Sequence, residues 1–193
     1  MITGRAKPPG FTLIELMVGL AILALLLLLG VPSFTTFMRN SEIRSTAEST
    51  INGLRTASAE AANRNARVAF TLAGSGDAGW TINLVKDPAT MELEEPPLQR
   101  FVSKEAGRTT KVTTTPGGKL QVTFNGLGRI ENQGTADHLQ QIDIASTVSG
   151  DARPLRIIVD DPSPPTAGKP RGLRLCDPDP ALLNLTPPDP RAC

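Results

Sequence analysis

The chain has 193 residues, which is enough for one domain of ordinary size with an appendage. Its 20 lysines and arginines almost balance its 19 aspartates and glutamates, and this balance excludes a nucleic-acid-binding surface that extends over the whole molecule. The 17 glycines and 17 prolines predict many loops.

A long apolar run near the amino terminus predicts a membrane segment. In residues 11–31 only Thr12 and Glu15 are appreciably polar, and a helix of this length would measure about 31 Å, enough to cross a bilayer. The residues before it include Arg5 and Lys7 but no acid, so we expect the amino end to stay in the cytoplasm and the rest of the chain to lie outside it. A cleaved secretory signal is the weaker interpretation, because the run is long and no small-residue cleavage site follows it.

Glu15 does not fit a plain membrane anchor, because an unpaired ionisable side chain in a membrane costs several kcal/mol. The stretch GFTLIEL at residues 10–16 resembles the class III signal of type IV pilins and type II secretion pseudopilins. The resemblance implies that a prepilin peptidase cuts between Gly10 and Phe11, methylates the new amine of Phe11 and removes a ten-residue leader. It also implies that Glu15 pairs with the Phe11 amine of a neighbouring subunit, so that two charges that are costly to bury alone neutralise each other in a filament.

The next stretch, residues 32–65, predicts an amphipathic helix that ends near Asn65. Pro32 removes one backbone hydrogen bond, so we expect the helix to bend or melt locally there. The charged side chains, which are mixed in sign, are interpreted as a solvated face. Apolar residues recur at spacings of three and four, which indicates one buried face, at Ile43, Ala47, Ile51, Leu54, Ala57 and Ala61.

From residue 66 the sequence pattern changes from helical to β-type. The turn residues Pro116-Gly117-Gly118 predict a hairpin between the fourth and fifth of the runs listed below. The fold class is therefore α+β, with a long amino-terminal helix packed on an antiparallel β domain at residues 66–160. The predicted strands lie in residues 67–72, 79–85, 98–103, 109–115, 119–124, 139–145 and 154–159.

Three stretches in the rest of the chain resemble the FimT/GspH group of pilin-like proteins. They are LRTASAEAANRN at residues 54–65, Gly79-Trp80, and FNGLGR at residues 124–129. The resemblance implies a type IV pilin-like fold over most of the chain. Trp80 is interpreted as a core residue, and Gly126 and Gly128 as turn glycines, because a phosphate-binding loop would need a third glycine between a strand and a helix.

Residues 161–193 are rich in proline, so we expect a stiff, extended backbone between turns and no regular helix. Because this segment would face an oxidising compartment, Cys176 and Cys193 are expected to form a disulfide worth about 3 kcal/mol. The alternatives are metal binding and redox chemistry. The only histidine, His138, is distant in sequence and no CxxC motif is present, so no metal site and no cofactor is predicted.

The carboxyl-terminal arginines add a candidate DNA-binding site. RLCDP and DPRAC, at residues 174–178 and 189–193, resemble the tail of FimT-type minor pilins, in which a GRxRxC strand end precedes a disulfide-closed loop. In some FimT proteins these arginines are implicated in binding DNA during natural transformation, so the resemblance implies Lys169, Arg171 and Arg174 as candidates. Arg174 takes the place of the second arginine, whereas Arg171 and Gly172 stand in reverse order. The equal alternative is that these side chains only solvate a strand end, and three phosphate contacts would in any case give weak binding.

The sequence therefore predicts a minor pilin of the FimT type that takes part in type IV pilus assembly or initiation and is not an enzyme, since no nucleophile with a general base is visible. The expected partners are a prepilin peptidase, other major and minor pilins or pseudopilins, the bacterial inner membrane and, weakly, DNA. The alternative is a GspH-type minor pseudopilin of the type II secretion system. The predicted parts are a leader (1–10), a transmembrane or filament-core helix (11–31), an amphipathic helix (32–65), a periplasmic β domain (66–160) and a disulfide-closed segment (161–193).

Overall fold

The chain divides into two compact units. The first contains the residues up to Phe37, and the second contains Met38–Cys193. The computed structural model describes residues 10–74, 77–102, 110–133, 135–148, 150, 152–160, 172–185 and 189–193, without the side chains of residues 28–33, 77 and 183. Nearly all of the leader predicted at residues 1–10, the candidates Lys169 and Arg171, and most of the linker before residue 172 therefore lie outside the described residues.

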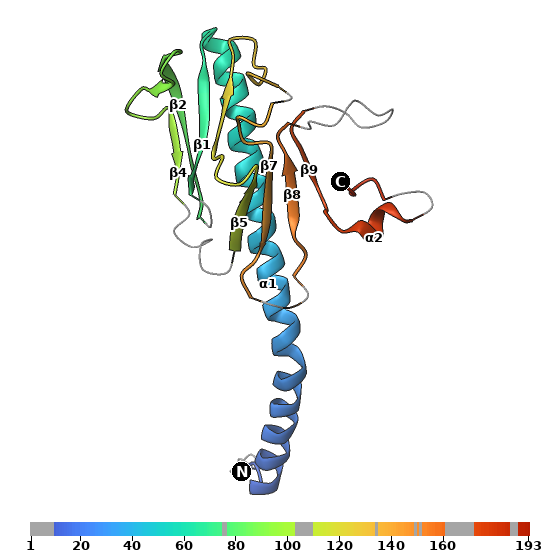
Figure 1. Cartoon of the computed structure of the whole chain (residues 1–193). Helices are drawn as coiled ribbons and strands as arrows, with labels where there is room; N and C mark the ends of the chain where they lie inside the picture. Colours follow the sequence, from blue (N-terminus) through green and yellow to red (C-terminus); the bar gives the residue numbers. More distant parts are fainter. Residues whose placement is uncertain are drawn as a thin grey trace, which may run out of the picture. The chain divides into compact units, whose positions relative to one another are not determined.

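One helix, α1 (Leu13–Arg64), contains 52 residues and ends where the sequence predicts (Figure 1). Asn65 has a φ of 47°, and the N–H groups of Asn65 and Ala66 donate to the carbonyls of Ala62 and Ala61 at 3.3 and 3.2 Å. A left-handed residue that follows the helix, together with these 5→2 and 6→1 hydrogen bonds, is a Schellman motif. The motif satisfies carbonyl groups at the helix end and stops the helix.

The helix continues through Pro32 without a break, so the predicted local melting is wrong. A proline in a helix interior removes a single backbone N–H, and the long helical stretches on both sides keep the neighbouring residues helical.

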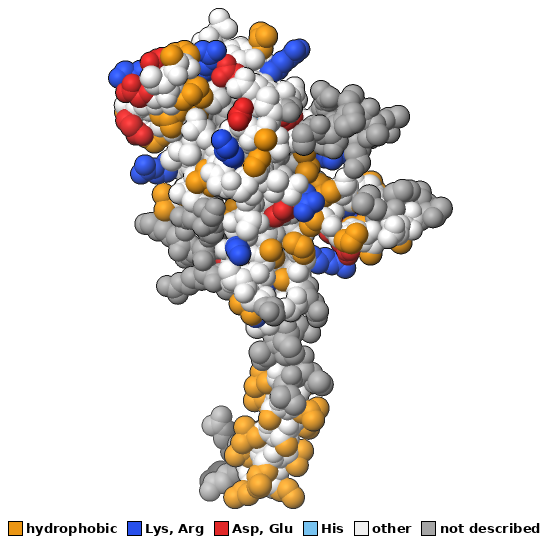
Figure 2. Space-filling model, viewed as in Figure 1, with side chains coloured by type: hydrophobic (Ala, Val, Ile, Leu, Met, Phe, Trp, Pro, Cys, Tyr) orange, Lys and Arg blue, Asp and Glu red, His pale blue; other side chains and the backbone are white. Residues whose placement is uncertain are grey.

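The first unit exposes its apolar side chains. The large apolar residues from Phe11 to Leu27 are between 51 and 86% exposed, and they gather over the first turns of α1 (Figure 2). Apolar surface of this extent marks a surface that is covered by another molecule. No helix in the parts of the chain that the structure describes is both long enough and apolar enough to cross a membrane. The span at residues 11–31 stays a prediction, and the side chains of residues 28–31 lie outside the described set.

The second unit contains two antiparallel sheets, as the α+β prediction requires. Each of the seven predicted runs contains a strand, and the short β3 and the edge strand β9 add two more. The first sheet has the order β3-β2-β1-β6, with β4 also paired to β2, and consists of β1 (Val68–Gly74), β2 (Asp77–Asp87), β3 (Glu92–Leu93), β4 (Gln99–Phe101) and β6 (Gln121–Phe124). The second has the order β5-β7-β8-β9 and consists of β5 (Thr110–Thr115), β7 (Gln141–Ser146), β8 (Leu155–Ile158) and β9 (Arg174–Cys176).

The predicted hairpin at residues 116–118 is wrong. The turn itself is present, because the Lys119 N–H donates to the Pro116 carbonyl at 3.2 Å. The strands on its two sides belong to different sheets, however, since β5 pairs with β7 and β6 pairs with β1. The turn therefore carries the chain from one sheet to the other, and long-range pairing decides the partner of each strand.

The core lies between the second half of α1 and both sheets. All six apolar residues predicted on the buried face of the helix are at most 4% exposed. They form one cluster with side chains from both sheets, including Val122 of β6 and Ile142 of β7. Trp80 is buried, as predicted, and a Cβ built on Gly53 would lie 2.9 Å from its ring. Glycine at position 53 therefore allows the helix to approach the first sheet closely at the tryptophan.

The carboxyl-terminal segment contains a short helix, α2 (Pro180–Leu183), which contradicts the prediction of no regular helix there. The Asp179 side chain caps it by accepting from the Ala181 N–H at 2.9 Å, and Pro180 is its first residue. Proline is favoured at this position because the first helical N–H groups lack partners within the helix, so a proline-rich sequence can still begin one.

Candidate functional site

The predicted processing site lies at the start of α1. Gly10, Phe11 and Thr12 precede the helix, and a Cβ built on Gly10 would meet no atom within 4 Å. The Thr12 hydroxyl accepts from the Glu15 N–H at 3.3 Å, and the Thr12 carbonyl accepts from the Leu16 N–H at 3.2 Å. Thr12 is thus the helix N-cap, and Gly10 and Phe11 on either side of the predicted cleavage point are both exposed.

Glu15 lies in the first turn of the helix, where a negative charge is stabilised by the positive end of the helix dipole. Its side chain is exposed, and among the described residues none forms an ion pair with it. Thr12 and Glu15 also have the spacing of a capping box, in which a threonine at the N-cap is followed three residues later by a glutamate. This local signal for a helix start is present in the sequence in addition to the resemblance to the pilin signal. The carboxylate is therefore placed four residues after Phe11 and is available to a cation of another molecule.

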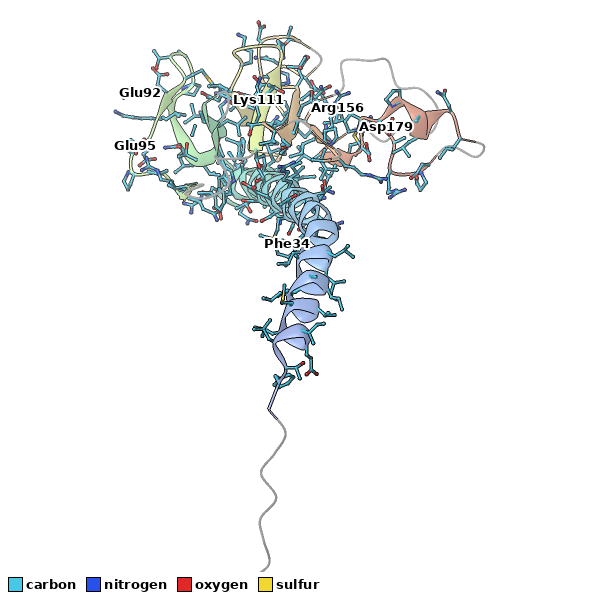
Figure 3. The ribbon with its side chains drawn as sticks, turned by 90° about the horizontal axis from the view of Figure 1, so that it is seen from below. Phe34, Glu92, Glu95, Lys111, Arg156 and Asp179 are labelled. Atoms are coloured by element: carbon cyan, nitrogen blue, oxygen red, sulfur yellow. A yellow bond between two sulfur atoms is a disulfide. The ribbon has the colours of Figure 1, made fainter. Side chains whose placement is uncertain are left out.

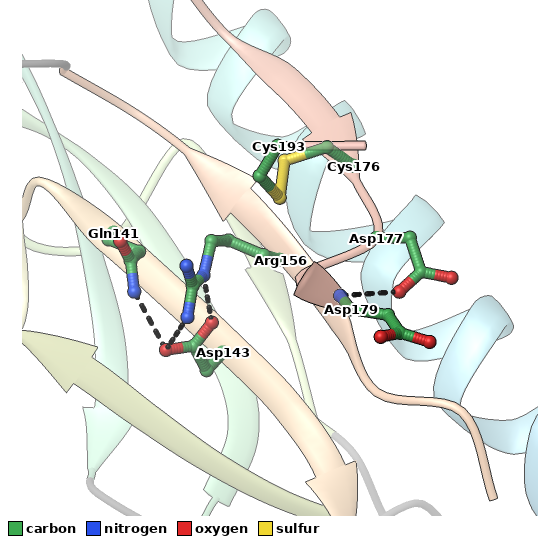
Figure 4. The surroundings of a disulfide bond; sticks show 7 residues. All are labelled: Gln141, Asp143, Arg156, Cys176, Asp177, Asp179 and Cys193. Atoms are coloured by element: carbon green, nitrogen blue, oxygen red, sulfur yellow. Dashed lines mark hydrogen bonds and ion pairs between the residues drawn. A yellow bond between two sulfur atoms is a disulfide. The ribbon is translucent and has the colours of Figure 1, made fainter. Parts of the chain in front are cut away.

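A disulfide joins Cys176, at the end of β9, to Cys193 (Figure 4). Their Cα atoms are 5.1 Å apart, and the Asp177 N–H and carbonyl bond to Arg191 and Cys193 at 2.7 and 3.1 Å. The last residues of the chain therefore add a short parallel bridge beside the end of β9.

Asp189 and Arg191 form an ion pair within this closed loop, with Nε and Nη2 3.0 and 2.7 Å from the carboxylate oxygens. Hydrogen bonds from the Arg191 side chain lower the pKa of Asp189 to about 2. Because this folded-state pKa is lowered, the pair contributes above the ordinary aspartate pKa, and its contribution disappears as the pH falls towards 2.

Replacing both cysteines with serine (Cys176→Ser/Cys193→Ser) should lower the free energy of unfolding by about 3 kcal/mol, because the loop closed by the disulfide gains freedom in the unfolded chain. For a chain of this size the melting temperature should fall by about 6–12 °C. Thermal melting of the full-length protein in detergent measures the change. Reduction of the wild-type protein should reproduce the shift, and an unchanged melting temperature in the double variant would contradict the prediction.

Of the three predicted DNA-binding residues, the structure describes only Arg174. It is half-buried on β9, where its backbone pairs with Ile158 of β8. The predicted cluster of Lys169, Arg171 and Arg174 is therefore not brought together within the described residues.

Two further cations, which the sequence analysis did not single out, lie on the second sheet with Arg174. Arg156 of β8 donates to Asp143 of β7 through Nε at 2.6 Å and Nη2 at 3.3 Å (Figure 4). The Gln141 amide donates to the same carboxylate at 2.7 Å. Lys111 is exposed on β5 (Figure 3). Alternation along each strand could have indicated their outward direction, but their proximity depends on strand pairing.

The only histidine, His138, is buried, and its Nε2 lies 3.2 Å from the Asp160 carboxylate. The contact therefore links the segment before β7 to Asp160, two residues after the end of β8. His138 is far in sequence from the two cysteines. Over the described part of the chain, no group of three or more potential metal ligands comes together.

Two sequence-family models match the chain. The model of the type II transport protein GspH matches residues 46–162, and the model of the prokaryotic N-terminal methylation motif matches residues 6–31. The first covers the second half of α1 and most of the two sheets, and the second covers the processing junction and the apolar run. These matches confirm the resemblance that the sequence motifs indicate.

Two solved structures are similar to this chain, and both are crystal structures of the type IV minor pilin FimU of Pseudomonas aeruginosa (strain PAO1). Each is 18% identical in sequence. In one crystal form the TM-score is 0.47, with 64% of this chain and 86% of FimU covered. In the other the TM-score is 0.43, with 61% and 85% covered. No protein with a curated description matches the sequence.

Proposed function

Because the chain belongs to the family of the type II transport protein GspH and carries a prokaryotic N-terminal methylation motif, we propose that it is a minor pilin of the FimT type. In this proposal it takes part in the assembly or initiation of a type IV pilus. Membership in this pilin-like family implies a membrane-anchored subunit that contacts other pilins and a processing peptidase. The role is structural, and no catalytic step is assigned to it.

The observation that carries the proposal is the arrangement at the start of α1. An exposed glycine-phenylalanine junction precedes a capped helix that exposes a carboxylate in its first turn and large apolar side chains after it. In the proposal, the peptidase cuts between Gly10 and Phe11, Phe11 is methylated, and residues 11–31 anchor the chain in the inner membrane. The β domain then faces the periplasm, an oxidising compartment in which Cys176 and Cys193 form their disulfide.

In the assembled filament, Glu15 of one subunit would neutralise the Phe11 amine of a neighbour. Removal of the leader creates this amine next to the N-cap Thr12, so each mature subunit would carry one new cation and one carboxylate within the same turn of chain. Both charges are costly to bury unless each meets an opposite charge, and the pairing therefore fixes the position of one subunit against the next.

The second candidate function is that of a minor pseudopilin in a type II secretion system, which the description of the matched family favours. Both functions share the processing site and Glu15. The disulfide-closed tail supports the pilus, because the FimT-type tail pairs two cysteines. We propose in addition that Lys169, Arg171 and Arg174 give this tail a weak affinity for DNA.

Deletion of the gene, followed by two measurements in the same strain, tests the proposal. A minor pilin should be needed for normal numbers of surface pili, counted by electron microscopy, and for its own appearance in sheared pili. The amount of protein exported by type II secretion should not change. Normal piliation with defective secretion would instead establish the pseudopilin function.

A further inference from the structure

Three cations lie on one diagonal of the second sheet, on the face that points away from α1. Strand pairing places Ile158 opposite Arg174, and Arg156 opposite Cys176 and Asp143. Inward positions such as Ile142, Ile144 and Ile157 are buried in the core, so the alternate positions form the outer face. The three residues, called the cation row below, are Arg174 of β9, Arg156 of β8 and Lys111 of β5.

The spacing within the cation row follows from sheet geometry. Arg156 lies one strand and two residues from Arg174, which corresponds to about 8 Å between Cα atoms. Thr113 pairs with Asp143, so Lys111 lies two strands and two residues from Arg156, about 12 Å away. The row therefore crosses all four strands and is about 20 Å long, the length of about six nucleotides of one DNA strand.

The outer face around the row is mostly polar at its described strand positions, and its apolar members are Ala145, Ile158 and the buried, disulfide-bonded Cys176. Among its described strand positions Asp143 is the single acid, and its carboxylate accepts from both Arg156 and Gln141. The Arg156 side chain remains about 30% exposed, so guanidinium N–H groups that do not contact Asp143 are available to a ligand. Thr113, which pairs with Asp143, supplies a hydroxyl group between Lys111 and Arg156, and the described positions of this face include no aromatic side chain.

We propose that the cation row binds the phosphate backbone of duplex DNA, with Lys111 and Arg156 as contacts in addition to Arg174. This inference rests on the proposed DNA affinity of the tail and extends the site from the strand end across the sheet. Single strands bind proteins largely by stacking bases on aromatic rings, which the described face does not offer, so duplex is the favoured ligand. Contacts to phosphates alone carry no sequence preference.

Asp143 acts as a positioning residue in this site. Its two contacts with Arg156 hold the guanidinium over the centre of the row, while its charge opposes the approach of phosphate. The pair is thus electrically neutral, and the binding of Arg156 to phosphate depends on its directed N–H groups rather than on net charge.

The test is the dissociation constant for a 30-base-pair duplex, measured by fluorescence anisotropy with the full-length protein in detergent at about 50 and 200 mM salt. The variants are Lys111→Gln, Arg174→Gln and the charge-balanced pair Arg156→Gln/Asp143→Asn. Each should raise the dissociation constant about 3- to 10-fold at the lower salt. Lys111→Gln and Arg174→Gln should each also reduce the salt slope by about 0.9, whereas the charge-balanced pair, which leaves the net charge unchanged, should leave the slope nearly unchanged. The matched control is Arg44→Gln, which removes a cation from the exposed side of α1 and should change binding less than twofold.

The possible outcomes distinguish the cation-row proposal from the proposed DNA affinity of the carboxyl-terminal tail. If Arg174→Gln weakens binding but Lys111→Gln and the charge-balanced pair do not, the tail binds DNA and the cation row is wrong. If the wild-type protein shows no salt-dependent binding of duplex, both proposals are wrong. Equal weakening by Arg44→Gln would show that only net charge matters, which also overturns the row. Melting temperatures of all variants confirm that each one is folded.

Discussion

Glu15→Ala is expected to abolish incorporation of the protein into filaments while leaving membrane insertion and leader cleavage intact. The substitution removes the proposed partner of the Phe11 amine of the neighbouring subunit. Removing one member of a buried ion pair costs about 3–5 kcal/mol, which corresponds to more than a hundredfold loss of subunit association. The fold should not change, because Glu15 is exposed and makes no ion pair within the described chain.

Three measurements on one strain decide the Glu15 prediction: the mass of the mature protein, its amount in the membrane fraction, and its amount in sheared filaments. Glu15→Gln should fail like Glu15→Ala, since it keeps the size and loses the charge, whereas Glu15→Asp should retain part of the incorporation. Glu48→Ala is the matched control, because it removes another exposed acid of α1 that pairs with Arg44. Normal incorporation of Glu15→Ala would refute the charge-pairing proposal.

The helix was predictable because its signals are local. The spacing of apolar residues such as Ile43 and Leu54 identified the buried face, and every predicted member is buried. The end near Asn65 follows from one residue that adopts a left-handed conformation more readily than most. The processing motif is local in the same sense, since its chemistry depends on a few adjacent residues.

The hairpin error and the two missed cations came from interactions between distant parts of the chain. The turn at Pro116 has the expected residues, but β6 pairs with β1 rather than with β5, and no signal near the turn encodes that choice. The cation row is similar: Arg156 and Lys111 are far apart in sequence and become neighbours on one face only through the register of β5, β7 and β8. Sequence reasoning reached Arg174 by resemblance to a tail motif, and that motif does not extend across the sheet.

Gly10→Val is expected to block removal of the leader completely. The structure separates this effect from misfolding, because a side chain at position 10 would meet no other atom within 4 Å. Valine is therefore compatible with the fold, and any block must arise where the peptidase has to approach the carbonyl carbon of residue 10. A branched side chain on that residue obstructs the approach, whereas glycine leaves the peptide bond open.

The intact mass of the membrane-bound protein measures processing: the variant should retain all 193 residues and an unmethylated Phe11, whereas the wild type should lose its first ten. Gly19→Val is the matched control, since position 19 is equally open but lies beyond the junction, and this variant should be processed normally. A mature mass for Gly10→Val would refute the assigned cleavage site.

The uncut chain also has no free amine at Phe11, so it should be missing from filaments even though its own Glu15 is intact. If instead it enters filaments as the full-length precursor, the pairing of Glu15 with a neighbour's amine is not what holds the subunits together.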